Sequence, residues 1–232
     1  MKTIKSVKIA GYAVKYIVLL LFAVIFLFPV AEMILKSFMS DLDIRFGELF
    51  PTSFEFLSYR KAIDAKYWWW LKNTLVIGVI NMIGITLSSS LCAFGFSKLN
   101  FKGRETLFFV VLATLMLPSI CMQIPLYKIY YGMNWTNTWL PLTVPGFCGG
   151  GALNIFLMRQ YMKGTPDTIC EAAKMDGANK FVVYAVIVMP MCLPIMGYVA
   201  LTSFLGCWND FMTPFLFLHS RENTTLMLEM YR

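Results

Sequence analysis

TPDTICEAAKMDGANKFVVYAVIVMPMCLP, residues Thr165–Pro194, is an island of charged and polar residues followed and preceded by apolar runs. Its first half carries the signals of a short helix, because Thr165 can cap the N-terminus and Pro166 can take the first helical position, where no N–H is needed. Gly177 tolerates the left-handed conformation that ends many helices, and Asn179 can cap the next one. The stretch predicts a helix, a tight turn and a second helix at the edge of a membrane.

The first of these two helices would present a surface of low profile. Ile169, Ala172 and Ala173 lie on one stripe at helical spacing, and adjacent alanines let another backbone approach closely. Periodicity alone is equally consistent with an ordinary amphipathic helix that lies on lipid headgroups. Both interpretations stay open at this level.

The composition is typical of a polytopic membrane protein. Of 232 residues, 58% are hydrophobic and only 14% are charged. The six cysteines show no CxxC spacing, so neither a disulfide framework nor a zinc site is expected, and the single histidine, His219, excludes most histidine-based chemistry. The sequence has no GxxxxGK[ST] phosphate loop, so any ATP must be bound by another chain. We therefore expect no enzyme activity, no cofactor and no metal site in this chain.

Five apolar runs predict an all-α bundle of five membrane spans in a single domain, residues 1–232. The predicted spans cover residues 17–35, 74–96, 107–126, 140–158 and 182–205. A polar cytoplasmic loop is expected over 159–181. The first span is longer than the roughly 7–15-residue core of a signal peptide, so we expect it to stay uncleaved. The second is rich in Gly, Ser and Thr, which suits close helix packing in lipid.

Glycine, proline and aromatic residues mark special positions along these spans. The glycine run 149–151 predicts a loosened or broken fourth span. Pro190 and Pro194 are expected to kink the fifth span, and a role in gating follows as a hypothesis. The cluster Tyr67–Trp70 predicts an aromatic belt at the membrane interface, with carbohydrate stacking as the alternative.

Charge counting predicts the orientation. With the N-terminus inside, the inner segments hold eleven of the 20 basic residues and four of the 13 acidic residues, and the outer segments hold nine of each. The eleven inner basic residues are Lys2, Lys5, Lys8, Lys15, Lys98, Lys102, Arg104, Arg159, Lys163, Lys174 and Lys180. This bias follows the positive-inside rule and accounts for the net charge of +7 without nucleic acid. It places the N-terminus and the Thr165–Lys180 turn in the cytoplasm.

The polar stretch also resembles the EAA signature of the permease subunits of ATP-binding-cassette (ABC) importers. The resemblance rests on Glu171, Ala172, Ala173, Asp176, Gly177 and Ala178, followed by Ile187, Pro190 and Pro194. In that family the segment is the coupling helix, which docks into a cleft on a separate ATPase subunit. The resemblance implies that the first six residues couple the chain to the ATPase, with Glu171 as the best candidate for a polar contact and Gly177 as the turn.

Other landmarks resemble the carbohydrate branch of this family, the maltose-type permeases of binding-protein-dependent transport. They are Pro29, Phe101-Lys102-Gly103-Arg104, Pro118, Ile124-Pro125-Leu126, Phe156-Leu157-Met158-Arg159-Gln160 and Trp208-Asn209-Asp210. Trp208, Asn209 and Asp210 are expected near the outer surface, where they support a substrate cavity, help a binding protein to dock, or only cap a turn. Family members carry a sixth span after a segment that resembles Arg221–Leu228, so we expect this chain to lack one helix of the family's set.

The resemblance implies a permease subunit of a sugar or oligosaccharide importer in the bacterial plasma membrane. The implied partners are ABC ATPase subunits that bind the ATP, a second permease subunit, and an extracellular or periplasmic solute-binding protein. Two alternatives stay open: an importer of another solute, such as a polyol phosphate or an amino acid, and a truncated scaffold that binds its partners without transport. A secondary transporter is disfavoured, because no intramembrane carboxylate pair or inverted repeat stands out.

Overall fold

The computed structural model describes residues 2–64 and 67–232, and it describes the side chains of all of these except residues 2–10, 13 and 64. The predicted inner charges at Lys2, Lys5 and Lys8 therefore lie outside the described side chains. The chain forms two compact units that meet in sequence before Tyr67, and each is described by itself. Across the described residues both units are helical, and no strand occurs among them.

Unit 1 consists of one long helix followed by two short ones. α1 (Lys2–Lys36) contains the stretch Val14–Lys36, which is long and apolar enough to cross a membrane. α2 (Asp41–Phe46) begins with a capping box, in which Ser40 and Asp43 exchange hydrogen bonds between side chain and backbone. α3 (Leu57–Asp64) completes the unit.

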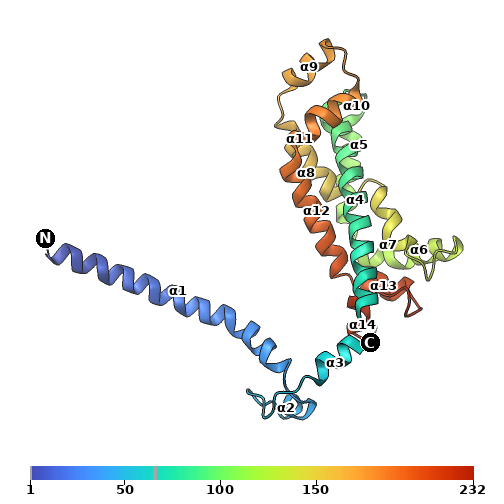
Figure 1. The fold of residues 1–232 in the computed structure, drawn as a ribbon. Helices are drawn as coiled ribbons and strands as arrows, with labels where there is room; N and C mark the ends of the chain where they lie inside the picture. The colour runs from blue at the N-terminus through green and yellow to red at the C-terminus, as the bar shows by residue number, and fades with distance from the viewer. Residues whose placement is uncertain (1, 65–66) are drawn as a thin grey trace. The chain divides into compact units, whose positions relative to one another are not determined.

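Unit 2 is a bundle built around α4 (Tyr67–Lys98), along which α8 (Ala152–Lys163) and α12 (Leu193–Trp208) pack (Figure 1). The helices between α4 and α8 are α5 (Arg104–Ala113), η1 (Thr114–Met116), α6 (Ser119–Gly132), α7 (Leu140–Thr143) and η2 (Val144–Phe147). Those between α8 and α12 are α9 (Asp167–Met175), α10 (Lys180–Val182), the π-helical segment η3 (Val183–Val188) and α11 (Met189–Met191). α13 (Met212–Phe217) and α14 (Leu226–Met230) follow α12.

Small residues on α4 allow its neighbours to pack closely. A Cβ atom at Gly78 would lie 2.9 Å from the ring of Phe204 on α12, and one at Gly84 would lie 2.6 Å from the ring of Phe147. The polar residues buried on the same helix are Asn73, Thr74, Asn81, Thr86, Ser89 and Ser90. The prediction that this Gly-, Ser- and Thr-rich span packs closely is therefore confirmed.

The predicted third and fifth spans are not continuous helices. Among the described residues, the stretches Val14–Lys36, Tyr67–Lys98 and Leu140–Lys163 are each long and apolar enough to cross a membrane. The third predicted span is a helix pair bent by 99°, and the fifth is a pair bent by 80°. Counting each bent pair as one span gives up to five spans, so the count lies between three and five.

Proline chemistry explains where these helices break. Pro118 disfavours helical backbone at the residue before it, and Leu117 is extended, with φ −80° and ψ 119°, between η1 and α6. In the fifth predicted span, Cys192 leaves the helical conformation between α11 and α12, with Pro190 and Pro194 on either side. Pro190 also lacks the N–H that a regular helix needs, and the π-helical turns of η3 lie directly before α11.

The fourth predicted span is broken at the glycine run, as the sequence predicts. Gly149, Gly150 and Gly151 have φ values of 93°, 66° and 92°, which glycine adopts without the steric penalty of a Cβ. They separate η2 from α8. A Cβ at Gly150 would lie 2.4 Å from the carbonyl oxygen of Ile85 on α4, so this glycine also permits a close approach to the central helix.

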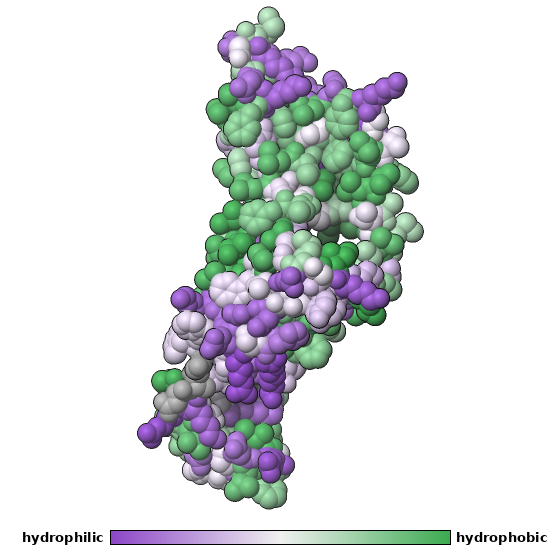
Figure 2. All heavy atoms as spheres, turned by 90° about the vertical axis from the view of Figure 1, so that its right-hand side faces the viewer, coloured by the Kyte–Doolittle hydropathy of each residue, from purple (hydrophilic) through white to green (hydrophobic). Residues whose placement is uncertain are grey.

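A cluster of buried hydrophobic residues lies where α4, α8, α9, η3 and α12 meet. Its members are Ala93, Phe94, Met158, Met162, Cys170, Val183, Tyr184, Val188, Cys192, Met196 and Val199. Figure 2 shows hydrophobic side chains over the middle of unit 2 and hydrophilic ones at the end that carries α9. The core therefore extends to the polar end of the bundle, where it packs against α9 through Cys170.

Candidate functional site

α9 is a separate nine-residue helix at one end of the bundle, and its C-terminus is closed by a Schellman motif (Figure 1). Gly177 has φ +87°, and its amide donates to the carbonyl of Lys174 at 3.1 Å. The amide of Ala178 donates to the carbonyl of Ala173 at 2.9 Å. Asn179 then caps α10 with its side chain. The predicted left-handed turn and the predicted cap of the second helix are both confirmed.

The N-terminal cap of α9 differs from the prediction. Pro166 occupies the N-cap position and no side chain caps the helix, so the prediction that Thr165 is the cap is wrong by one residue. Thr165 is buried, and its backbone carbonyl accepts a hydrogen bond from the ammonium group of Lys98 at 2.7 Å. The same ammonium group forms an ion pair with Asp167 at 2.6 Å. A cation from α4 therefore fixes the start of α9.

The residues of α9 and of the turn that follows it divide between a buried side and an exposed side. Cys170 is buried, and Ala173 and Ala178 are partly buried against the same cluster, so this face rests on the core. On the other side Met175 is 87% exposed. The remaining signature residues are exposed as well, namely Glu171, Ala172, Asp176 and Gly177. The exposed side therefore combines polar residues with small ones, and the coupling role of these residues stays a prediction.

A second buried cation joins the helix ends beneath α9. The side chain of Arg159 on α8 is 3% exposed, and its Nε donates to the carbonyl of Phe96 at 3.0 Å. Its other end pairs with Glu105 on α5, and its Cζ lies 3.8 Å from the ring centre of Phe108. Arg159 therefore ties α8 to the ends of α4 and α5. In the sequence, Lys98 and Arg159 contribute to the predicted charge bias and Arg159 also belongs to a family landmark, but neither is predicted to fix a helix end; their place at the ends of apolar runs is the available signal.

The ion pair at the start of α9 is insensitive to pH near neutrality. The hydrogen bond from Lys98, and then its charge, hold the pKa of the Asp167 carboxyl below its ordinary value of 3.8. A carboxyl with a lowered pKa in the folded state stabilises that state at pH values above its ordinary pKa. This contribution is lost only as the pH falls through the lowered pKa. The contact therefore holds throughout the physiological range.

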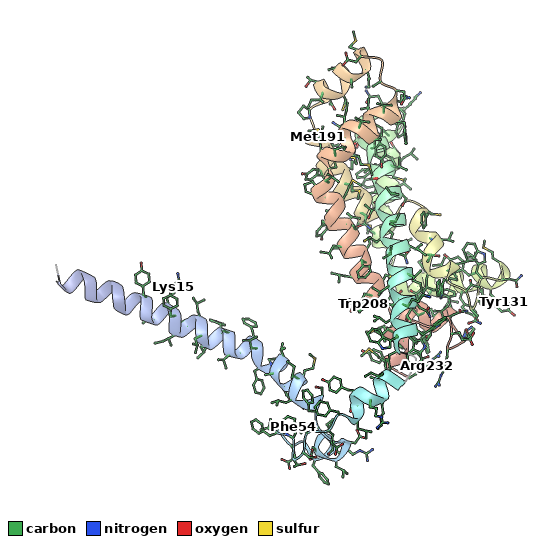
Figure 3. The ribbon with its side chains drawn as sticks, in the orientation of Figure 1. Lys15, Phe54, Tyr131, Met191, Trp208 and Arg232 are labelled. Atoms are coloured by element: carbon green, nitrogen blue, oxygen red, sulfur yellow. The ribbon has the colours of Figure 1, made fainter. Side chains whose placement is uncertain are left out.

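The two predicted kink prolines are exposed and flank the break at Cys192. Figure 3 labels Met191 at this break and Trp208 at the other end of α12. The bend of 80° follows α9 in the chain after α10, η3 and α11. A gating role for Pro190 and Pro194 stays a prediction.

A cavity of about 560 Å³ lies between α4, the glycine run and α12, and Asp210 is among its lining residues. Trp208 and Asn209 are not among the described residues that line it. The side chain of Trp208 packs on Phe204, and the side chain of Asn209 donates to the carbonyl of Leu205 at 2.8 Å. The structure therefore puts one of the three predicted outer-cavity residues at a cavity and gives the other two contacts at the end of α12.

The aromatic cluster before the second predicted span binds a loop of the same chain. The indole N–H groups of Trp69 and Trp70 donate to the carbonyls of Glu222 and Arg221, both at 2.9 Å. Further donors to this loop are Asn73 and Trp139. These indoles fasten the loop between α13 and α14, a role that the sequence pattern does not predict. The predicted interfacial belt stays a prediction.

A bundle of long, interrupted apolar helices with a short polar helix at one end is typical of a polytopic membrane protein. Residues 80–229 match the family described as the binding-protein-dependent transport system inner membrane component, and the chain belongs to this family. It is therefore a permease component of an inner membrane transport system and not an enzyme in itself.

Several characterised relatives are similar over most of the chain. The arabinooligosaccharides transport system permease protein AraQ of Bacillus subtilis is 29% identical over 213 residues, which cover 89% of this chain and 75% of AraQ. The trehalose/maltose transport system permease protein MalG of Thermococcus litoralis is 29% identical over 210 residues, 89% of this chain and 76% of that protein. The diacetylchitobiose uptake system permease protein NgcG of Streptomyces coelicolor is 28% identical over 204 residues, 87% of this chain and 68% of NgcG. The predicted resemblance to ABC importer permeases, including the maltose type, is confirmed.

A solved structure has the same fold. A chain in the crystal structure of a bacterial ABC transporter involved in the import of the acidic polysaccharide alginate superposes with a TM-score of 0.81 and 24% identity. The match covers 94% of this chain and 77% of that chain. This similarity confirms the helical membrane-protein fold.

Proposed function

We propose that this chain is the permease subunit of an ATP-driven ABC importer for a sugar or oligosaccharide. Family membership supports the transport role, and the names of the relatives support the solute class, since they refer to arabinooligosaccharides, diacetylchitobiose and trehalose/maltose. With a second permease subunit, the chain would form the translocation path, and residues 1–232 would act as one transmembrane domain.

The observation that carries the proposal is the geometry of α9. Its exposed face holds Glu171, Ala172 and Asp176, and both of its ends are fixed to the bundle. Small residues permit close docking, and Glu171 offers a carboxylate for an ionic or polar contact across the interface. These properties suit a rigid element that docks into a cleft on a separate ATPase subunit.

The contacts beneath α9 supply a route for mechanical coupling. A push on α9 reaches α4 through the Lys98 pair with Asp167, and it reaches α8, η3 and α12 through the buried face at Cys170. ATP is bound by the partner ATPase, whose closure would move α9 and tilt the helices that it contacts. The break between Pro190 and Pro194 lies on this path and is the proposed hinge of the gating movement.

The remaining partners and the orientation follow from the same proposal. The N-terminus and α9 would face the cytoplasm of a bacterial cell, and a solute-binding protein would deliver the sugar from the other side. The excess of basic residues in the predicted inner segments supports this orientation.

Site-specific photo-cross-linking tests the docking. A photoreactive amino acid replaces Met175, which is 87% exposed on α9, and in the control it replaces Tyr131 on α6, which is 65% exposed. We expect the Met175 probe to cross-link an ABC ATPase subunit in membranes of the native host, and the Tyr131 probe to cross-link none. Mass spectrometry identifies the captured chain. Cross-linking of the ATPase from Tyr131 but not from Met175 would contradict the proposed docking surface.

A further inference from the structure

Among the described residues, the cavity between α4, the glycine run and α12 is lined by two asparagine side chains whose amide oxygens have no hydrogen-bond partner. Asn81 donates its amide nitrogen to the carbonyl of Leu142 at 2.6 Å, and Asn154 donates to the carbonyl of Gly150 at 2.7 Å. Because both side chains are held by the nitrogen, their amide oxygens remain available as acceptors.

The described residues that line the cavity include an acidic side chain and no basic one. Asp210 is the only Asp or Glu among the described lining residues, and no Lys, Arg or His lines the cavity with it. The amide of Thr213 donates to one oxygen of Asp210 at 3.0 Å, which fixes the orientation of the carboxylate. The volume of about 560 Å³ falls in the range of small-molecule sites, roughly 300–1,000 Å³.

We propose that this cavity is a solute site that accepts uncharged, hydroxyl-rich molecules and that Asp210 disfavours anions in it. The proposal rests on the proposed import function and names the charge class of its substrate. Sugar hydroxyls can donate to Asp210 and to the two amide oxygens. Tyr198 lines the same cavity, and its ring offers an apolar face to the C–H groups of a sugar.

An anionic solute would meet the opposite conditions in this cavity. It would give up water without gaining a countercharge, and it would be repelled by the carboxylate of Asp210. Uronate oligosaccharides and polyol phosphates are therefore poor ligands here. This separates the chain from the transporter with the similar fold, which is involved in the import of an acidic polysaccharide.

Cys207 also lines the cavity and can report its electrostatic field. The other five cysteines, Cys92, Cys121, Cys148, Cys170 and Cys192, are replaced by alanine in the full chain. Permeabilised membrane vesicles are treated with a trimethylammonium or a sulfonate methanethiosulfonate, and each rate is divided by the rate with a free thiol. We expect the cationic reagent to react about tenfold faster, and Asp210→Asn to abolish the difference. Equal rates, or a faster sulfonate reaction, in the chain with Asp210 would overturn the proposal, whatever the variant does.

A protection experiment identifies the solute class. An uncharged methanethiosulfonate labels Cys207 in the presence of arabinotriose, maltotriose or trimannuronate. We expect at least one neutral trisaccharide to slow labelling and trimannuronate to have no effect. Protection by trimannuronate, or by none of the three, would contradict the proposal.

The outcome is separable from that of the proposed function. Cross-linking of the ATPase from Met175 does not depend on the cavity. If the Met175 probe captures no ATPase while a neutral trisaccharide protects Cys207, only the proposed docking is rejected. The reverse result rejects only the proposed solute site.

Discussion

At the scale of single residues, backbone conformation and buried charge together set the angle of α9. Gly177 supplies a left-handed turn with φ +87°, and no atom lies within 4 Å of a Cβ built on it. A side chain there would therefore meet only the strain of its own backbone. At the other end, the side chain of Lys98 is 4% exposed and holds both Thr165 and Asp167. Two local constraints thus orient the whole helix.

We expect Gly177→Val to uncouple transport from ATP hydrolysis while the chain remains in the membrane. A β-branched residue at positive φ costs about 1–3 kcal/mol at the turn, which would shift α9 away from its docking angle. Gly177→Asn should retain most activity, because asparagine tolerates this conformation. The measurement is uptake of labelled sugar and ATPase activity in reconstituted vesicles.

The control for this prediction is Gly95→Ala on α4, which also has open space around the added Cβ but no positive φ. It should leave the ratio of uptake to ATP hydrolysis unchanged. If Gly177→Val behaves like Gly95→Ala, the turn does not determine coupling.

At the scale of elements, the breaks in the helices shape unit 2 as much as the helices do. The 99° bend follows Leu117 and Pro118, and the 80° bend lies at Cys192. The glycine run, in contrast, interrupts the helix and also packs against α4, because Gly150 lies against its backbone. Its cavity-lining position makes this break part of the proposed solute site.

We expect Gly150→Ala to destabilise the bundle more than Gly103→Ala. Both residues have positive φ, 66° and 85°, so each alanine costs about 1–2 kcal/mol in backbone strain. Only Gly150 would place its Cβ 2.4 Å from the carbonyl oxygen of Ile85; at Gly103 no atom would lie within 4 Å of the added Cβ. This overlap adds about 1–3 kcal/mol. Thermal unfolding of the purified proteins in detergent measures the difference, and equal midpoints would show that the contact with α4 relaxes freely.

At the scale of the whole molecule, the orientation in the membrane decides whether α9 can reach an ATPase. The helical elements and their polar ends agree with either direction of insertion. The direction is predicted by the charge bias, with eleven basic and four acidic residues in the predicted inner segments.

Cysteine accessibility tests this orientation on a chain without native cysteines. Met175→Cys on α9 should resist an impermeant thiol reagent added to intact cells, and Ser53→Cys in unit 1 should react with it. Both positions are exposed, so burial does not explain a difference between them. Met175 is preferred to Asn179, whose side chain caps α10. The opposite labelling pattern would overturn the orientation and the proposed docking together.

Much of the candidate site could be predicted because its signals are local. The helix end at Gly177, the cap at Asn179 and the broken helix at 149–151 each depend on the residue itself and on the few that follow. The prediction that Thr165 caps α9 was wrong, because the start of α9 depends on a distant residue. Lys98, 67 residues away, binds the Thr165 carbonyl. The kink that Pro190 and Pro194 predict in the fifth span is also present, but its size of 80° depends on the surrounding helices and could not be predicted from the prolines alone.

The sequence by itself determined the membrane class, the short capped helix, the family resemblance and the charge bias, since composition, turn residues and spacing are properties of neighbouring positions. Only the tertiary structure decided which side chains meet. Arg159 reaches the carbonyl of Phe96 across 63 residues, and Trp70 reaches that of Arg221 across 151. The cavity likewise collects Asn81, Asn154 and Asp210 from separate helices and loops. Such contacts depend on how helices cross, and crossing is set by small residues and helix breaks acting together through close packing.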